Sequence, residues 1–101
     1  MVVERLVFRG KFGQSDAIVQ SFREWKARIG ARFGAPIRLL VDVTGPLFTV
    51  VVEIEYRDLA HFDELQRREQ ELYGGAEFER WFAGWSAVTA SGTRELYRVV
   101  E

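Results

Sequence analysis

The sequence predicts an α+β fold in which a helical layer covers one four-stranded antiparallel sheet. Two runs rich in β-branched and aromatic residues meet at Gly45-Pro46, a break that the interior of a strand would not tolerate. A helical pattern precedes this hairpin and another follows it, while strand patterns begin and end the chain. The order strand, helix, hairpin, helix, strand closes into one sandwich. With 101 residues, the chain is expected to form one domain spanning residues 1–101.

The first strand is expected over residues 2–12, where apolar and charged positions alternate. Its apolar face consists of Leu6, Phe8 and Phe12. A turn follows, with Ser15 as the predicted N-cap of the first helix and Asp16 in its first turn. The strand is therefore expected to lead directly into a helix.

This first helix is expected to continue to about residue 33. The apolar stripe that would face the sheet consists of Ile18, Phe22, Trp25, Ile29 and Phe33. Gly34 follows as a C′ residue, and Pro36 prevents the helix from continuing.

The hairpin over residues 37–56 alternates along both of its strands. The face expected to meet the helices carries Ile37, Leu39, Val41, Val43, Val50, Val52, Ile54 and Tyr56. The opposite face mixes charged with aliphatic side chains and carries Arg38, Leu40, Asp42, Thr44, Val51, Glu53 and Glu55.

The second helix is expected to be split into two segments. Asp58 is the predicted N-cap of the first segment, which covers residues 59–73. Gly74-Gly75 interrupts the helix, and the second segment covers residues 76–90. The apolar arc of this second segment consists of Phe78, Trp81, Phe82, Trp85 and Val88.

The closing strand is expected over residues 93–100, after a stop at Ser91-Gly92. In the common split βαβ arrangement the strand order is 4-1-3-2, and both helices lie on one face. The free face would then carry a charge network of Arg5, Arg9, Arg38, Glu53 and Glu55. It would also carry Val7, Leu40 and Val51, which make it too apolar to remain in water. A second copy of the chain is expected to cover this face, giving a homodimer.

The composition is that of a folded protein, with 48% hydrophobic and 29% charged residues. A net charge of −1 gives no general attraction to nucleic acid or to an anionic membrane, so neither is an expected partner. RNA-binding RRM domains share the strand order but stack bases on strand aromatics, where this chain has Glu53 and Glu55. The initial run MVVERLVFRGKF is unlike a signal peptide or a membrane span, which favours a cytoplasmic location. With no cysteine and one histidine, no metal site or cofactor is expected.

The layout, together with the closing run EFERWFAGWSAVTASGTRELYRVV from Glu77, resembles the dimeric α+β-barrel superfamily with its ferredoxin-like βαββαβ protomer. The branch it most resembles is that of small NIPSNAP-like proteins, and antibiotic-biosynthesis and heme-degrading monooxygenases belong to the same superfamily. The resemblance implies two sheets packed face to face in a dimer and a cavity in each protomer between sheet and helices. The monooxygenases commonly use Asn with Trp or His, and this sequence contains no Asn. Monooxygenase roles are therefore not transferred to His61 or to the tryptophans.

Two residues are candidates for proton transfer. Helical geometry places Glu69 on an otherwise apolar face, where a carboxylate either pairs with Arg or has a raised pKa; the alternative is that it reaches solvent. His61 is the only histidine and falls in the first turn of the second helix, where its imidazole suits proton transfer or has a purely structural position.

The aromatic residues could line a pocket for a flat organic molecule, or they could only fill the core. The predicted pocket residues are Trp25, Trp81, Trp85 and Tyr97. The first functional hypothesis is a homodimer that binds a small apolar or aromatic molecule between sheet and helices. The second is a cofactor-independent monooxygenase or related small enzyme in which Glu69 or His61 transfers a proton.

Overall fold

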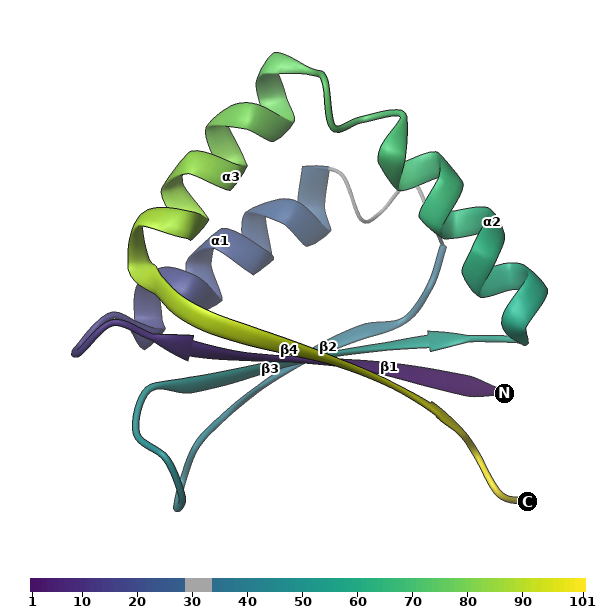
Figure 1. The fold of residues 1–101 in the computed structure, drawn as a ribbon, viewed down its shortest axis with the longest axis horizontal. Helices are drawn as coiled ribbons and strands as arrows, with labels where there is room; N and C mark the ends of the chain where they lie inside the picture. The colour runs from purple at the N-terminus through teal and green to yellow at the C-terminus, as the bar shows by residue number, and fades with distance from the viewer. Residues whose placement is uncertain (29–33) are drawn as a thin grey trace.

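The computed structural model describes residues 1–28 and 34–101, and Figure 1 shows its ribbon. Its elements in chain order are β1 (Val2–Gly10), α1 (Ser15–Arg28), β2 (Ile37–Val41), β3 (Thr49–Tyr56), α2 (Leu59–Gln70), α3 (Ala76–Val88) and β4 (Thr89–Arg98). The predicted succession of strands and helices, including the split second helix, is confirmed. The expected helical positions Ile29 and Phe33 lie outside the described residues.

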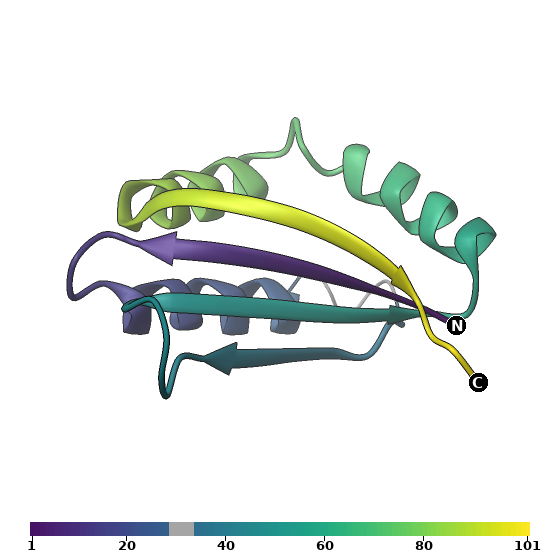
Figure 2. The same ribbon diagram turned by 60° about the horizontal axis from the view of Figure 1, so that its bottom comes forward.

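The four strands form one antiparallel sheet in the order β2-β3-β1-β4, which is 4-1-3-2 when read from the β4 edge. The helices cover one face of this sheet, and the other face is left without a helical layer (Figure 1). The turned view shows the long, twisted β4 beside β1, with α2 and α3 above them (Figure 2). Both strands at the centre of the sheet, β1 and β3, therefore have one face toward the helices and one face away from them.

The core lies between the central strands and α1. Ile18, Val50 and Val52 are the most completely buried large side chains among the described residues. Ile18 belongs to α1, whereas Val50 and Val52 alternate with half-buried neighbours along β3, as the period of two in the sequence predicts. Phe22 and Trp25 of α1 are buried as well, so the predicted apolar stripe of this helix is confirmed over its described part.

The split between α2 and α3 has a local cause. Asp58 caps the start of α2, because its Oδ1 accepts a hydrogen bond of 2.8 Å from the His61 backbone N–H. At the other end, α2 stops at Gln70, a turn follows, and Gly75 has an extended backbone as the N-cap of α3. The predicted interruption at Gly74-Gly75 is therefore confirmed, although α2 is shorter than expected.

Among the described residues, no helix is long and apolar enough to span a membrane.

The start of β4 differs from the prediction. The sequence placed helix up to residue 90 and a stop at Ser91-Gly92, whereas β4 already begins at Thr89 and includes both residues. Gly92 pairs with Phe8 of β1, and a Cβ at Gly92 would lie 2.7 Å from Phe8 Cδ1. The glycine is thus required inside the strand because the Phe8 ring occupies the place of a side chain.

Two details at the end of β1 also differ. The strand ends at Gly10, so Phe12 is not on the apolar face but is 86% exposed, with its ring 4.8 Å from that of Phe48. Helix α1 begins at Ser15 itself, which makes Ser15 the first helical residue instead of the N-cap, while Asp16 lies in the first turn as predicted. At this end β1 also shifts register against β4 between Arg9 and Gly10, and a bend and a turn follow Gly10.

The substitution Gly92→Ala should destabilise the fold by about 1–3 kcal/mol, because the new methyl group overlaps the buried Phe8 ring. Gly84→Ala is the matched control, since nothing lies within 4 Å of a Cβ at this position in α3. That control should stabilise the protein by about 0.5–1 kcal/mol through the helix propensity of alanine. Urea unfolding measures both changes, and equal effects of the two substitutions would contradict the close packing at Gly92.

Candidate functional site

A cavity of ≈ 240 Å³ lies between the helix-facing side of the sheet and the three helices. Strands β1 to β4 and all three helices contribute to its lining. Among the residues predicted from the sequence, the cavity is lined by Trp25, Trp81, Trp85 and Glu69. Tyr73 and Phe82 also line it and are 44% and 47% exposed, so the cavity reaches the surface near the turn between α2 and α3.

The aromatic wall of the cavity is built mainly by α3. Trp81 and Trp85 stack with an interplanar angle of 6° and a centroid separation of 5.7 Å, because they are one helical turn apart. Phe22 of α1 meets the Trp81 ring edge-on at 5.4 Å. The Trp81 indole N–H donates to the Ser21 carbonyl, which fixes α3 against α1. The wall is therefore apolar and held in place from two helices.

The opposite part of the cavity is polar, and its centre is Glu4 of β1. This side chain lies on the helix-facing side of the strand and is only 3% exposed. Its Oε1 accepts a hydrogen bond of 3.0 Å from the Tyr56 hydroxyl, and its Oε2 is 2.6 Å from Nε of Arg94. Arg94 Nη2 in turn donates to Gln66 Oε1 at 2.7 Å. Side chains of three strands thus meet at one buried carboxylate, and α2 is linked to it through Arg94.

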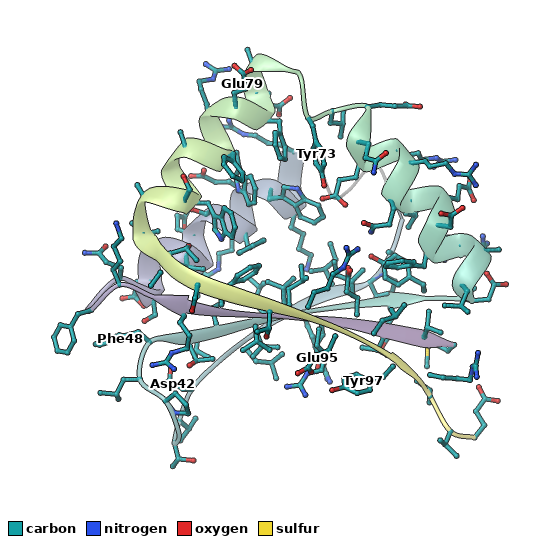
Figure 3. The ribbon with its side chains drawn as sticks, viewed as in Figure 1. Asp42, Phe48, Tyr73, Glu79, Glu95 and Tyr97 are labelled. Carbon is teal, nitrogen blue, oxygen red and sulfur yellow. The ribbon has the colours of Figure 1, made fainter. Side chains whose placement is uncertain are left out.

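Glu69 of α2 lies beside this group and also lines the cavity. Burial raises the pKa of its carboxyl group, and the negative charge of Glu4 raises it further, whereas the hydrogen bond from Tyr73 and the charge of Arg94 act in the opposite direction. Burial and the nearby Glu69 raise the pKa of the Tyr73 hydroxyl to about 12, so it remains protonated and able to donate. Figure 3 shows Tyr73 on the turn after α2, on the helix-covered side of the sheet. Glu69 is half-buried and lines the cavity, so of the two positions that the sequence left open for it the structure has the one on the inner face of α2.

His61 lies outside this cavity. Its Nδ1 accepts a hydrogen bond of 3.0 Å from the Arg57 backbone N–H, and its own backbone N–H is bound by the Asp58 cap. These two contacts close the first turn of α2 reciprocally. The structure therefore gives His61 a structural position and leaves Glu69 as the candidate for proton transfer that faces the cavity.

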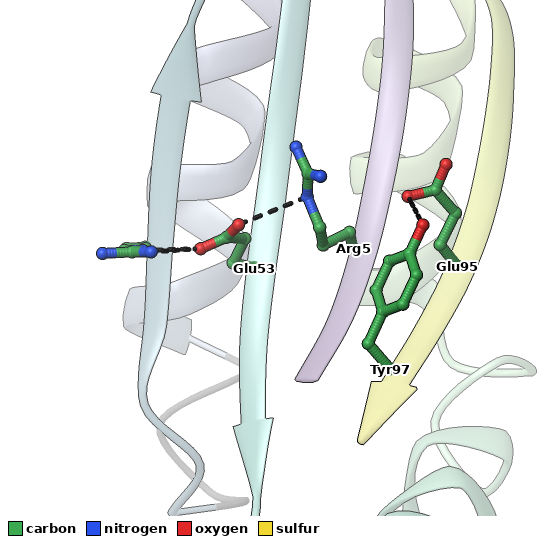
Figure 4. A network of polar contacts seen from close by, with 5 residues as sticks. Arg5, Glu53, Glu95 and Tyr97 are labelled. Atoms are coloured by element: carbon green, nitrogen blue, oxygen red, sulfur yellow. Dashed lines mark hydrogen bonds and ion pairs between the residues drawn. The ribbon is translucent and has the colours of Figure 1, made fainter. Parts of the chain in front are cut away.

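Tyr97 does not line the pocket, contrary to the prediction. It belongs to the face of β4 that points away from the helices, together with Glu95, to which its hydroxyl donates at 2.8 Å (Figure 4). The physical reason is the strand alternation, since Arg94 reaches Glu4 on the helix-facing side and residues at odd positions therefore face the other way. Tyr97 is 50% exposed on this free face.

The predicted charge network on the free face forms around one carboxylate. Glu53 of β3 pairs across the sheet with Arg5 at 3.3 Å (Figure 4). It also pairs with Arg38 of β2 at 2.6 Å. The strand register places Arg9 opposite Thr49 and Glu55 opposite Val3, toward the two ends of the face. The ion pairs described here are therefore centred on Glu53, with Arg9 and Glu55 at its periphery.

Sequence reasoning missed the residues that make the cavity polar. Glu4 has the same parity as Leu6 and Phe8, so its position on the helix-facing side could have been read from the alternation. The position of Arg94 could likewise have been read from the alternation of the closing strand, because it lies on the face opposite to that of Glu95 and Tyr97. That these two residues, 90 positions apart, meet each other follows only from the pairing of β1 with β4.

Within residues 1–28 and 34–101, no group of three His, Cys, Asp or Glu side chains could hold a metal ion.

The arrangement is similar to that of known structures. A NIPSNAP domain protein from Burkholderia xenovorans superposes over 99% of this chain and 95% of its own, with a TM-score of 0.82 and 17% identity. A NIPSNAP family protein from Agrobacterium tumefaciens covers 99% of this chain and 93% of its own, with a TM-score of 0.80 and 22% identity. The chain has the NIPSNAP-like fold.

The same fold extends to a second group of proteins. A structure described as an antibiotic biosynthesis monooxygenase covers 100% of both chains, with a TM-score of 0.68 and 20% identity. Neither a protein-family model nor a curated protein matches this sequence. The resemblance inferred from the closing run is thus confirmed at the level of the NIPSNAP-like fold.

Stability should depend on pH through Glu69. Because its pKa is raised on folding, the folded state binds a proton more tightly than the unfolded state, and the protein loses stability as pH rises from the ordinary glutamate pKa through the raised one. Glu69→Gln removes this loss. As pH rises through this interval, the free energy of unfolding of the variant should therefore increase relative to that of the parent. At higher pH the difference between the two proteins should stay constant.

Urea unfolding of both proteins at a series of pH values measures this difference. Glu71→Gln is the control, because it removes the same charge from an exposed position two residues away. Its difference from the parent should be nearly independent of pH. A flat difference for Glu69→Gln as well would contradict the raised pKa.

Proposed function

We propose that this protein binds a small aromatic or apolar organic molecule in the cavity between sheet and helices. The observation that carries the proposal is the combination of a ≈ 240 Å³ aromatic-walled cavity with a few converging polar groups. Ligand pockets in proteins have this character, in which apolar walls provide affinity and a small number of polar groups set the orientation. For scale, an apolar cavity of about 150 Å³ is large enough to hold benzene.

The walls and the polar end support different parts of this function. Trp81 and Trp85 are only partly buried by the protein itself, so a flat ligand stacked in the cavity would cover apolar surface that is otherwise incompletely packed. Glu4 and Glu69 lie at the polar end, where they would orient a substituent on the ring system. The partial exposure of Tyr73 provides a route of entry.

Calorimetric titration with 2-naphthalenemethanol tests the binding function. Ala35 lines the cavity, so Ala35→Phe should fill part of it and weaken binding by about tenfold or more. Ala87→Phe adds the same side chain at an exposed position of α3 and should leave binding unchanged. Native mass spectrometry of freshly purified protein should also detect a copurifying organic molecule. Equal binding by the two variants would place the ligand outside the cavity.

A second candidate function is that of a cofactor-independent monooxygenase or related small enzyme. The observation in its favour is the half-buried Glu69, which lines the cavity and whose raised pKa beside Tyr73 is suited to general acid and base chemistry. Similar structures described as antibiotic biosynthesis monooxygenases add weight to it. Dioxygen uptake with polycyclic phenols, compared between the parent and Glu69→Gln, is the test, and absence of uptake by the parent would leave this candidate without support.

We further propose that two copies of the chain pack through the free faces of their sheets. This face carries half-buried Val7 and Val51 beside Leu40, which is 37% exposed, so water contacts apolar side chains in the isolated protomer. Arg5 and Glu53 provide opposite charges at its centre. Under a two-fold axis, each arginine can approach a carboxylate of the other copy, which makes the face self-complementary.

Sedimentation velocity at micromolar concentration should therefore show a dimer. Val51→Lys should convert it to a monomer, because the substitution places a charge between the two sheets. Val43→Lys adds the same charge at a position in the β2–β3 loop that is 95% exposed, and it should leave the dimer intact. A parent protein that sediments as single chains would contradict the proposal.

A further inference from the structure

We propose that the cavity selects aromatic molecules that carry a protonated amine. This inference rests on the proposed binding function and names its ligand class. Among the described lining residues, Glu4 and Glu69 provide two carboxylates, whereas Arg94 is the single basic side chain. The polar end therefore has an excess of acceptors and of negative charge.

Arg94 is already engaged by the protein. Its Nε lies 2.6 Å from Glu4, its Nη2 donates to Gln66, and its guanidinium carbon is 5.3 Å from the centre of the Phe62 ring. Its side chain is also 53% exposed, so part of its charge faces solvent. An acidic ligand would therefore have to compete with Glu4 for this guanidinium while approaching Glu69.

Glu69, in contrast, retains acceptor capacity. Glu4 uses one oxygen for Tyr56 and the other for Arg94, whereas the hydrogen bond described for Glu69 comes from Tyr73 alone. A carboxylate has about four lone-pair positions, so one donor leaves room for a second. Burial of Glu69 makes its negative charge costly, and a cation at this place would compensate that cost.

The aromatic wall continues directly from this carboxylate. The Tyr73 ring lies 4.6 Å from that of Phe78, which lies 5.8 Å from Trp81, which in turn stacks on Trp85. A ligand whose amine is at Glu69 can therefore place its ring along Trp81 and Trp85. Aromatic faces beside the amine add a cation–π attraction that a neutral or acidic substituent would not have.

The test compares three ligands of nearly the same shape by calorimetry at neutral pH: 2-naphthylmethylamine, 2-naphthalenemethanol and 2-naphthoic acid. The amine should bind about tenfold or more tightly than the alcohol, since hydrogen bonds to charged partners are stronger than neutral ones. The acid should bind most weakly. In Glu69→Gln the amine and the alcohol should bind equally, and retained binding of the alcohol shows that the variant is folded.

Glu71→Gln serves as the control, because it removes the same negative charge at an exposed position and should keep the preference for the amine. Tightest binding of the acid, equal binding of amine and alcohol by the parent, or a preference that survives in Glu69→Gln would each overturn this inference while leaving the binding function intact. If none of the three ligands binds, the proposed binding function itself fails.

Discussion

The burial of one carboxylate, that of Glu4, is the constraint on which the arrangement of the cavity depends. An ionised carboxylate at this depth is stable only with partners that replace water. Tyr56 on β3 and Arg94 on β4 provide them, and both are neighbours of β1 in the sheet. The strands that flank β1 are thus held to it by side chains as well as by the backbone ladder. The polar end of the cavity is a direct consequence.

The cavity itself results from the kind of residues in α3. This helix has aromatic side chains over most of its inner arc but no fully buried residue among them. Rigid rings one turn apart stack on each other, as Trp81 and Trp85 do, and a stack of this kind spans the gap to the sheet without filling it. Leu65 is the only buried residue of α2. The two helical segments therefore cover the sheet loosely, and the space between them and β1 remains open to a ligand.

The sequence alone predicts the fold well because its signals are local. Alternation in the hairpin, the Asp58 cap and the glycines at 74 and 75 each act within a few residues, and each predicted element is present. The predicted start of β4 was wrong. Glycine often follows the end of a helix, but Gly92 lies inside the strand because the Phe8 ring of β1 leaves no room for a side chain there. The site was predicted in part: Glu69 and the tryptophans follow from helical periodicity, whereas the Glu4–Arg94 pair depends on strand pairing. Tyr97 was misplaced because the parity of the closing strand is fixed by Arg94.

The two faces of the sheet are specified together. Glu4 points toward the cavity and Arg5, the next residue, points toward Glu53 on the free face. A register slip of one residue in β1 would move Glu4 away from Arg94 and Tyr56 and would turn Arg5 into the apolar core. Both changes leave a charge buried or unpaired, so the alternative register is penalised on both sides of the sheet at once. The same pair of adjacent charges therefore fixes the register of the central strand, shapes the polar end of the cavity and sets the charge pattern of the free face.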